Sequence, residues 1–178
     1  MRILIAAAVA LILLLLTSCG NTVQGDTSDG SDSSAANQES DYEIEYKDGG
    51  VKIVGYNGEG GDVTIPEQIG GMPVAEIGAR AFEGCTSLTG VSIHGGIGII
   101  GDDAFADCTS LSSVTIEDGV REIDEYAFSN CTALTRIDIP DSVTAIGRFA
   151  FSGCIDLTVA YHGRIYFDEK IFEVYTYE

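Results

Sequence analysis

The sequence predicts a β-rich solenoid, a fold in which successive windings of the chain stack on one another. One observation is a period of about 23 residues, a length typical of repeat units that bury their apolar faces against neighbouring units. Another is the alternation of apolar and polar residues within each unit, which is typical of a half-buried β-strand. The repeated positions form columns: Ile77, Ile100, Ile123 and Ile146; Ala81, Ala104, Ala127 and Ala150; Phe82, Phe105, Phe128 and Phe151; Cys85, Cys108, Cys131 and Cys154; and Leu88, Leu111, Leu134 and Leu157.

Each unit is expected to contribute one strand, for which the unit at Leu111 serves as the example. Val114 and Ile116 are predicted to point inward and the residues between them outward, because successive side chains of a strand face opposite sides. A turn and a shorter apolar segment, with Val120 and Ile123, follow. The predicted outward positions are Asp62, Thr64, Gly90, Ser92, His94, Ser113, Thr115, Glu117, Arg136, Asp138, Val159 and Tyr161.

The segment from Ile123 to Pro140 carries the full pattern of one unit, with isoleucine, alanine, phenylalanine, cysteine and leucine at fixed positions before the next strand. This pattern resembles the BspA-like class of leucine-rich repeats, and the resemblance covers residues 62–162. It implies a leucine-rich repeat solenoid over that range. It also implies a bacterial surface protein, because members of this class are often lipoproteins or wall-attached and are associated with adhesion and protein binding.

Both ends of the solenoid are expected to be capped by β-hairpins. Within residues 42–61, alternating segments flank Asp48-Gly49-Gly50, and an Asp-Gly turn between alternating segments predicts a hairpin. At the other end the repeat weakens, because Ala160 and His162 occupy positions that are apolar in earlier units. Residues 163–178 are predicted to form a second hairpin that protects the last sheet edge, since open edges invite aggregation.

The N-terminal region predicts export and a membrane anchor. Residues 1–18 combine the basic Arg2 with an apolar run too short to span a membrane, which is typical of a signal peptide. The end of this run, Leu16 to Gly20, resembles the bacterial lipobox, which implies cleavage before Cys19 and acylation of its thiol. The alternative is a plain secretory leader with an incidental cysteine. Residues 19–41 are polar and are predicted to be a disordered tether.

Composition and motifs argue against several other functions. The formal net charge of -19 disfavours nucleic acid as a partner, because such binding needs clustered lysine and arginine. His94-Gly95-Gly96 is similar to an oxyanion loop of some hydrolases, but its position in the repeat predicts a turn. We expect no enzyme, no cofactor and no metal site, because a stack of repeats spreads its polar residues along a sheet and away from any cleft.

The cysteine column leaves two alternatives open. Adjacent strands lie about 4.8 Å apart, whereas the Cβ atoms of a disulfide are separated by about 3.8 Å, so buried reduced thiols are one interpretation. The other is a pair of disulfides, Cys85–Cys108 and Cys131–Cys154.

The predicted function is binding or adhesion by a module displayed on the cell surface and held in the cell envelope by a lipid on Cys19. The expected partner is a protein or an extracellular-matrix ligand. The alternative is a non-catalytic spacer or an envelope-assembly lipoprotein. The predicted contact residues on the sheet face are Thr64, Ser92, His94, Ser113, Thr115, Glu117, Arg136, Asp138 and Tyr161.

Overall fold

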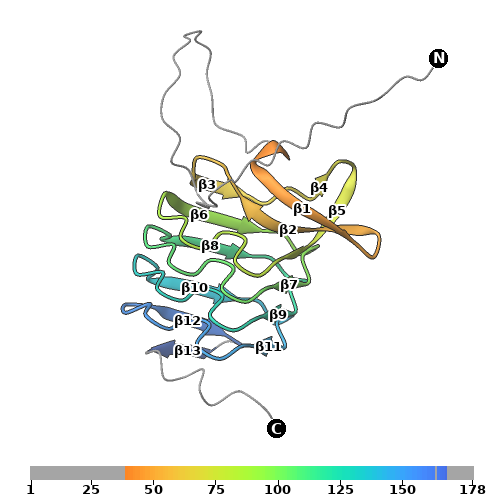
Figure 1. Ribbon diagram of the computed structural model, residues 1–178. Helices are drawn as coiled ribbons and strands as arrows, with labels where there is room; N and C mark the ends of the chain where they lie inside the picture. The colour runs from red at the N-terminus through yellow and green to blue at the C-terminus, as the bar shows by residue number, and fades with distance from the viewer. Residues whose placement is uncertain (1–38, 163, 168–178) are drawn as a thin grey trace, which may run out of the picture.

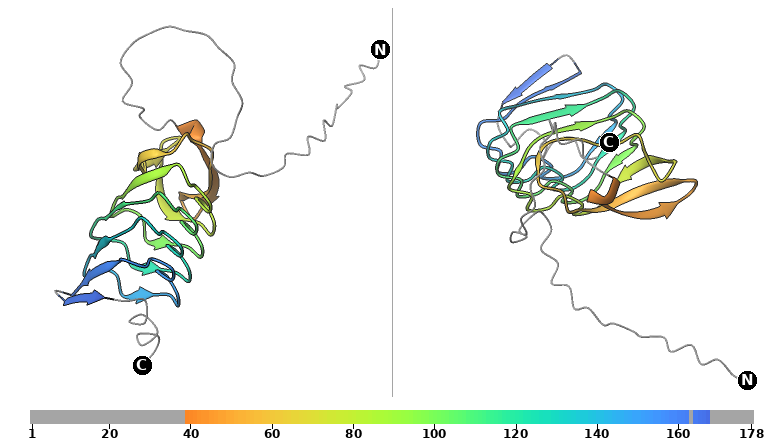
Figure 2. Two further views of the ribbon diagram at one scale, coloured as in Figure 1. Left: turned by 90° about the vertical axis from the view of Figure 1, so that its left-hand side faces the viewer. Right: turned by 90° about the horizontal axis from the view of Figure 1, so that it is seen from above.

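The computed structural model describes residues 39–162 and 164–167, and in this range the chain forms a solenoid of about five turns (Figure 1). The predicted signal peptide, Cys19, the predicted tether and residues 168–178 lie outside the described residues. In the side view of Figure 2 the coils stack along one axis, with the N-terminal hairpin at one end. Within the described residues, no helix has the length and apolar character needed to cross a membrane.

Two sheets run along the stack, and we call them sheet A and sheet B. Sheet A has the strand order β1-β2-β5-β7-β9-β11, with β4 paired to β5. A short 3-10 helix, Glu39–Asp41, precedes it. Its strands are β1 (Tyr42–Lys47), β2 (Gly50–Tyr56), β4 (Gln68–Ile69), β5 (Met72–Ile77), β7 (Ile99–Ile100), β9 (Glu122–Ile123) and β11 (Ala145–Ile146).

Sheet B has the strand order β13-β12-β10-β8-β6-β3. Neighbouring repeat strands are parallel, and their register places Val91 beside Val114 and Ile93 beside Ile116, as the repeat period predicts. Its strands are β3 (Gly61–Thr64), β6 (Leu88–Ile93), β8 (Ser113–Ile116), β10 (Arg136–Ile139), β12 (Thr158–Tyr161) and β13 (Arg164–Phe167).

The predicted columns form the core between the two sheets. Leu88, Leu111 and Leu134 are fully buried, and so are the first three phenylalanines of their column. The phenylalanine rings stack from coil to coil at centroid distances of 4.8, 5.1 and 5.6 Å. Identical side chains therefore lie above one another, which confirms the solenoid predicted from the sequence.

The predicted N-terminal hairpin is present, whereas most of the predicted C-terminal hairpin, residues 168–178, lies outside the described residues. At the N-terminal end β1 pairs antiparallel with β2, and β2 continues sheet A by pairing with β5. Tyr56, at the end of β2, stacks on Phe82 at 4.8 Å and so continues the phenylalanine column into the hairpin. At the C-terminal end β13 pairs antiparallel with β12.

The last coil departs from the predicted register by one residue. β10 and β12 pair with Ile137 beside Val159 and Ile139 beside Tyr161. Val159 is therefore buried, and Tyr161 is half-buried against the core, where its hydroxyl donates a hydrogen bond to the Val143 carbonyl at 2.6 Å.

The prediction that Val159 and Tyr161 point outward was wrong, and Thr158 and Ala160 take the outward register positions. A constant repeat period of 23 residues would have buried Ala160, whereas the register shift buries the larger Val159. Burial of the larger apolar side chain releases more surface from water.

The four repeat cysteines are buried and form no disulfide, so neither Cys85–Cys108 nor Cys131–Cys154 is bridged. From the second coil onward, each cysteine thiol donates a hydrogen bond to a phenylalanine carbonyl of the preceding coil. The pairs are Cys108 to Phe82 at 3.1 Å, Cys131 to Phe105 at 3.2 Å and Cys154 to Phe128 at 3.2 Å. A hydrogen bond with the Cys154 thiol, and then burial, raise the pKa of the Cys131 thiol. The column is thus a core element of buried, reduced thiols.

Candidate functional site

The outer face of sheet B brings together most of the predicted contact residues. Register pairs place Thr64 beside Ser92, Ser92 beside Thr115, and Thr115 beside Asp138. Ser113 and Arg136 belong to the neighbouring row of the same face, and all these side chains are exposed. The face is therefore a continuous surface of small polar side chains on a rigid stack.

Asp62 and Gly90 make one part of this face flat. Asp62 accepts a hydrogen bond from the Thr89 hydroxyl at 2.8 Å, which draws its carboxylate over the next coil. A Cβ atom added at Gly90 would lie only 2.5 Å from the Asp62 Oδ1 atom. Glycine at this position therefore accommodates the Asp62 carboxylate, which a larger residue would displace.

Arg136, the single arginine among the described side chains of this face, is already paired. Its Nη2 and Nε atoms donate to the two carboxylate oxygens of Asp138 at 2.6 and 3.2 Å. The side chains are 59% and 65% exposed, so the pair contributes about 0 to 1 kcal/mol to stability. A partner can therefore recruit either charge at small cost.

His94 and Glu117 lie beyond the strands, at the rim of the face. The His94 ring nitrogens contact main-chain groups only, with Nε2 at 3.1 Å from the Pro66 carbonyl and Nδ1 accepting from the Gly96 amide at 3.1 Å. Both contacts fit the neutral imidazole that carries its proton on Nε2. Glu117 accepts a hydrogen bond from the Gly95 amide at 3.2 Å. The turn predicted for residues 94–96 is confirmed. The side chains of His94 and Glu117 accept hydrogen bonds from its main-chain amides.

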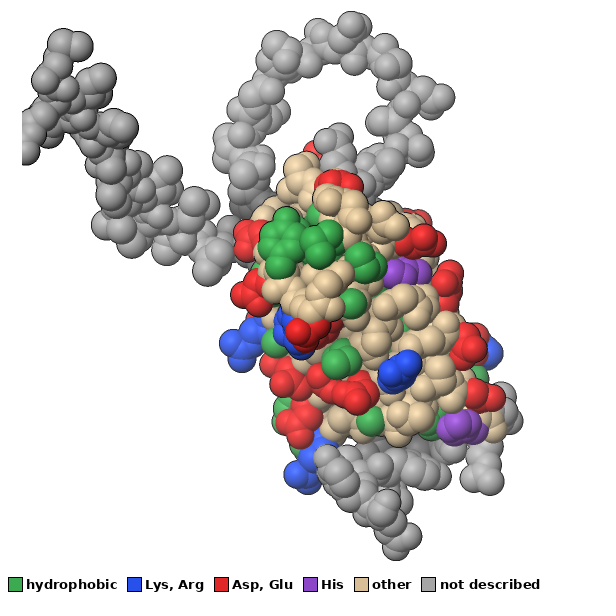
Figure 3. Space-filling view, turned by 90° about the vertical axis from the view of Figure 1, so that its right-hand side faces the viewer, with side chains coloured by type: hydrophobic (Ala, Val, Ile, Leu, Met, Phe, Trp, Pro, Cys, Tyr) green, Lys and Arg blue, Asp and Glu red, His purple; other side chains and the backbone are tan. Residues whose placement is uncertain are grey.

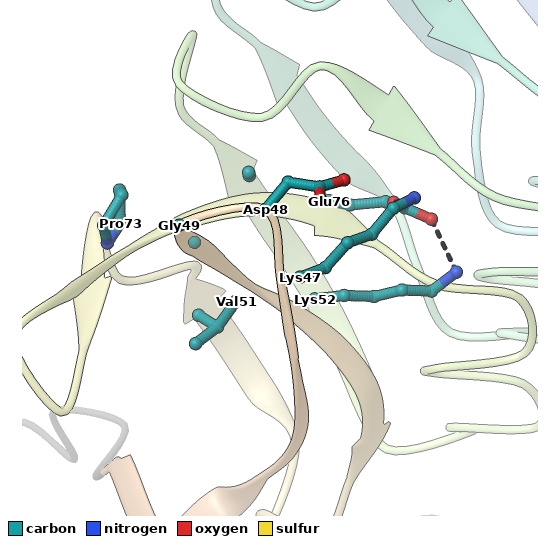
Figure 4. Close-up of a pocket in the computed structure, with 9 residues that line it drawn as sticks. Lys47, Asp48, Gly49, Val51, Lys52, Pro73 and Glu76 are labelled. Atoms are coloured by element: carbon teal, nitrogen blue, oxygen red, sulfur yellow. Dashed lines mark hydrogen bonds and ion pairs between the residues drawn. The ribbon is translucent and has the colours of Figure 1, made fainter.

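A shallow hollow of about 270 Å³ lies beside the N-terminal hairpin, and sequence reasoning missed it (Figure 4). Lys47 and Lys52 converge on Glu76 with Nζ–O distances of 3.0 and 2.5 Å. Burial raises the pKa of Glu76, but the hydrogen bonds from Lys52 and Lys47 outweigh burial and hold it below its usual value. Residues of β5 and of the β1–β2 hairpin line the hollow.

A pair of exposed aromatic rings is a second surface feature that sequence reasoning missed. Tyr126 and Phe149 occupy the same repeat position in successive coils, and their rings stack at 5.2 Å. Both residues have positive φ angles, 55° and 59°, which cost on the order of 1 kcal/mol for a side chain with a Cβ atom. Their equal spacing was a signal in the sequence, but their exposure was not.

Metal chemistry finds no support in the described part of the chain, where no group of three histidine, cysteine, aspartate or glutamate side chains could hold an ion.

Comparisons with known proteins agree with the repeat architecture. Residues 62–175 match the BspA type leucine rich repeat region, in six copies. No curated protein matches the chain.

Solved structures that are similar to this chain include three leucine rich repeat proteins. A leucine rich repeat protein of T. pallidum is 32% identical, with 69% of this chain and 70% of that chain covered and a TM-score of 0.60. One from Bacteroides capillosus is 35% identical, with 67% and 93% covered and a TM-score of 0.59. One from Bacteroides ovatus is 27% identical, with 68% and 40% covered and a TM-score of 0.54. The chain belongs to the family of BspA-type leucine-rich repeat proteins.

Proposed function

We propose that this protein is a surface-displayed binding or adhesion module that contacts a partner protein or an extracellular-matrix ligand through the outer face of sheet B. The observation that carries the proposal is the continuous exposed surface of Thr64, Ser92, Thr115 and Asp138 on adjacent strands. Because the stacked core holds these strands rigidly, binding does not require the face to become ordered first.

The small size of these side chains favours a partner that approaches closely along the strands. Serine and threonine hydroxyls both donate and accept hydrogen bonds, so the face can adapt to backbone or side-chain groups of a partner. The Arg136–Asp138 pair supplies one charge of each sign near the centre of the face. Affinity from such a face alone is expected to be modest, since aromatic anchors, which dominate tight interfaces, are scarce on it.

The proposed display rests on the N-terminal sequence. Acylation of Cys19 would hold the domain at a membrane surface in the cell envelope, with residues 20–41 between the anchor and the solenoid. Two or more acyl chains suffice for stable attachment, since each buried methylene contributes roughly 0.8 kcal/mol. His94 serves the turn in which it lies, because both of its ring nitrogens are engaged by the main chain.

The anchor is tested by comparing the full chain with its Cys19→Ser variant in bacteria fed an alkyne-labelled fatty acid. We expect label only in the unmodified sequence, and release of the variant from the membrane fraction. Protease treatment of intact cells then tests display, because a surface-displayed solenoid is accessible without lysis. Equal labelling of the variant would contradict the anchor and leave the plain secretory leader.

The binding face is tested with the Cys19→Ser chain as bait for host extracts, matrix proteins and envelope extracts of the producing bacterium. Thr115→Lys places a long charged side chain in the middle of the face and should abolish capture. Thr109→Lys adds the same group at an exposed position outside both sheets and should leave capture unchanged. Equal capture by both variants would contradict the sheet B face as the site. Capture only of envelope lipoproteins from the same cell would favour the alternative role in spacing or envelope assembly.

A further inference from the structure

The ring pair of Tyr126 and Phe149 is a surface feature that the fold itself does not require. The two side chains are 38% and 37% exposed, and their rings stack at an interplanar angle of 18°. They lie away from sheet B, because Tyr126 follows β9 and Phe149 follows β11, both strands of sheet A. They therefore add little to the core and present aromatic surface to solvent.

The backbone conformation at these positions works against aromatic side chains. Each coil has two positions in the left-handed region, which favours glycine, asparagine and aspartate. The second position follows this preference in every coil, with Gly84, Asp107, Asn130 and Gly153 at φ angles of 70°, 59°, 57° and 79°. The first position holds Arg80, Asp103, Tyr126 and Phe149 at φ angles of 61°, 53°, 55° and 59°. Tyr126 and Phe149 thus place large aromatic side chains on a strained backbone conformation.

Carboxylates crowd the surface beside Tyr126. Glu125 is its neighbour in the chain, and the Glu125 amide donates to the Asp102 carboxylate of the preceding coil at 3.1 Å. Burial, and then the charges of Asp102, Glu122 and Glu76, raise the pKa of Asp124, and they outweigh the opposing charge of Lys52. Figure 3 shows acidic side chains gathered on the side of the molecule where sheet A lies. This surface therefore attracts cations and repels anions.

One cation of the chain already lies against this surface. The guanidinium carbon of Arg148 is 5.9 Å from the centroid of the Phe149 ring, a distance at which the ring quadrupole attracts the positive charge. The coils are also joined here, since the Tyr126 amide donates to the Arg148 carbonyl at 3.1 Å. The Phe149 ring of the pair thus already has a guanidinium group within attractive distance in the structure itself.

We propose that Tyr126, Phe149 and the carboxylates of Asp102, Glu122, Asp124 and Glu125 form a second binding surface, whose ligand is a cationic peptide segment of a partner protein. The rings would receive arginine or lysine side chains, and the carboxylates would neutralise their charge. This surface is separate from the sheet B face, so either proposal can fail without the other. Charge complementarity selects the partner: an anionic or purely apolar segment would gain no compensation from the carboxylates.

The test uses the Cys19→Ser chain and fluorescein-labelled peptides of alternating glycine with arginine, lysine or glutamate, measured by fluorescence anisotropy at 0.15 M NaCl. We expect saturable binding of the arginine and lysine peptides and none of the glutamate peptide. The chain contains no tryptophan, so Phe149→Trp supplies a fluorescent reporter at the site. Its emission should change as the arginine peptide is added, with affinity equal to or above that of the unchanged chain.

Asparagine variants separate binding from folding. Tyr126→Asn and Phe149→Asn suit the left-handed backbone and preserve net charge, so their melting temperatures should stay the same or rise, while affinity for the arginine peptide falls at least tenfold. The matched control is Tyr46→Asn, which removes a tyrosine that is 72% exposed elsewhere and should leave affinity unchanged. Arg148→Gln removes the competing guanidinium and should tighten binding severalfold.

Charge is tested with the double variant Asp124→Asn/Glu125→Gln against the remote pair Asp141→Asn/Asp156→Asn, both of which remove two negative charges. A loss of affinity confined to the first double variant supports the proposal. Equal losses in both, or unchanged binding in the asparagine ring variants, would overturn it, since non-specific attraction to an acidic protein would then suffice. A sharp fall in the melting temperature of the asparagine ring variants would also overturn it, because the rings would then be structural. Thr115→Lys, on sheet B, should leave binding of the arginine peptide unchanged.

Discussion

The central coils and the two ends of the stack meet the same packing requirement with different parts of the sequence. In the centre, Phe105 and Phe128 lie in one column at 5.1 Å, each contributed by the same position of a repeat. At the N-terminal end, Tyr56 from a hairpin strand takes the equivalent place on Phe82 at 4.8 Å. At the C-terminal end, Tyr161 enters an isoleucine position after a shift of one residue.

The comparison shows that the stack requires an apolar group in each column and does not require a repeat unit to supply it. A central coil is bounded by two similar coils, so its period is tightly constrained. A terminal coil has a repeat neighbour on one side only, which allows a hairpin or a changed register to complete the column. Variants at the centre and at the ends should therefore differ in their effects on stability.

The largest effect is expected in the centre. Phe128→Ala removes a fully buried ring that stacks on Phe105 and Phe151, so it should lower the free energy of unfolding by about 3 to 5 kcal/mol. Phe151→Ala should cost less, because sheet A ends at β11 among the described residues and Phe151, stacked on Phe128, is the last residue of the phenylalanine column. Urea denaturation followed by circular dichroism measures both. A loss under about 1 kcal/mol for Phe128→Ala would contradict the role of this column in the core.

The buried cysteine column should also contribute to the stability of the central coils. Cys131→Ala removes a buried thiol that donates to the Phe105 carbonyl, and it should cost about 1 to 2 kcal/mol. Because the pKa of the Cys131 thiol is raised, the reactive thiolate should be absent at pH 8, and iodoacetamide should label this residue only after denaturation. Mass spectrometry of the Cys19→Ser chain measures the labelling, and rapid modification of the native chain would refute the buried thiol.

A smaller effect is expected at the C-terminal end. Tyr161→Phe keeps the ring and removes only the hydrogen bond to the Val143 carbonyl, so it should lower stability by about 0.5 to 1.5 kcal/mol. Tyr46→Phe removes a hydroxyl from a highly exposed ring and serves as the control with no expected change. Thermal unfolding compares the two variants. Equal melting temperatures would show that the shifted register of the last coil is not stabilised by this contact.

The smallest effect concerns the hollow at the N-terminal end. Lys52 and Lys47 hold the pKa of Glu76 below its usual value of 4.5, against the opposing effect of burial. The two ion pairs of Glu76 therefore contribute stability above about pH 4.5, and this stability is lost as the pH falls through the lowered pKa of Glu76.

Glu76→Gln should accordingly reduce stability near pH 7, by less than about 1 kcal/mol, and should weaken the loss between about pH 5 and 3. Glu59→Gln, at an exposed position, is the control. Urea denaturation at several pH values measures the difference. Parallel pH profiles for Glu76→Gln and the unmodified chain would contradict this contribution.

The candidate face was predictable from sequence only where local alternation and the period agree. Thr64, Ser92 and Thr115 follow from a period of two along each strand, and the structure places them side by side. Tyr161 was misplaced because one residue is missing between Leu157 and the buried position of β12, which a fixed period does not detect. His94 was placed on the strand because sequence alone does not show that the main chain engages its ring.

Sequence patterns alone predict the period, the core columns, the inward and outward positions of the central strands, the N-terminal hairpin and the family. These features are local or strictly repeated, so short-range patterns specify them. The folded structure was needed to establish the register of β12, the convergence of Lys47, Lys52 and Glu76, and the exposure of the stacked rings of Tyr126 and Phe149. Each of these features depends on contacts between segments that are separate in the sequence. Such contacts form where the segments together remove apolar groups from water.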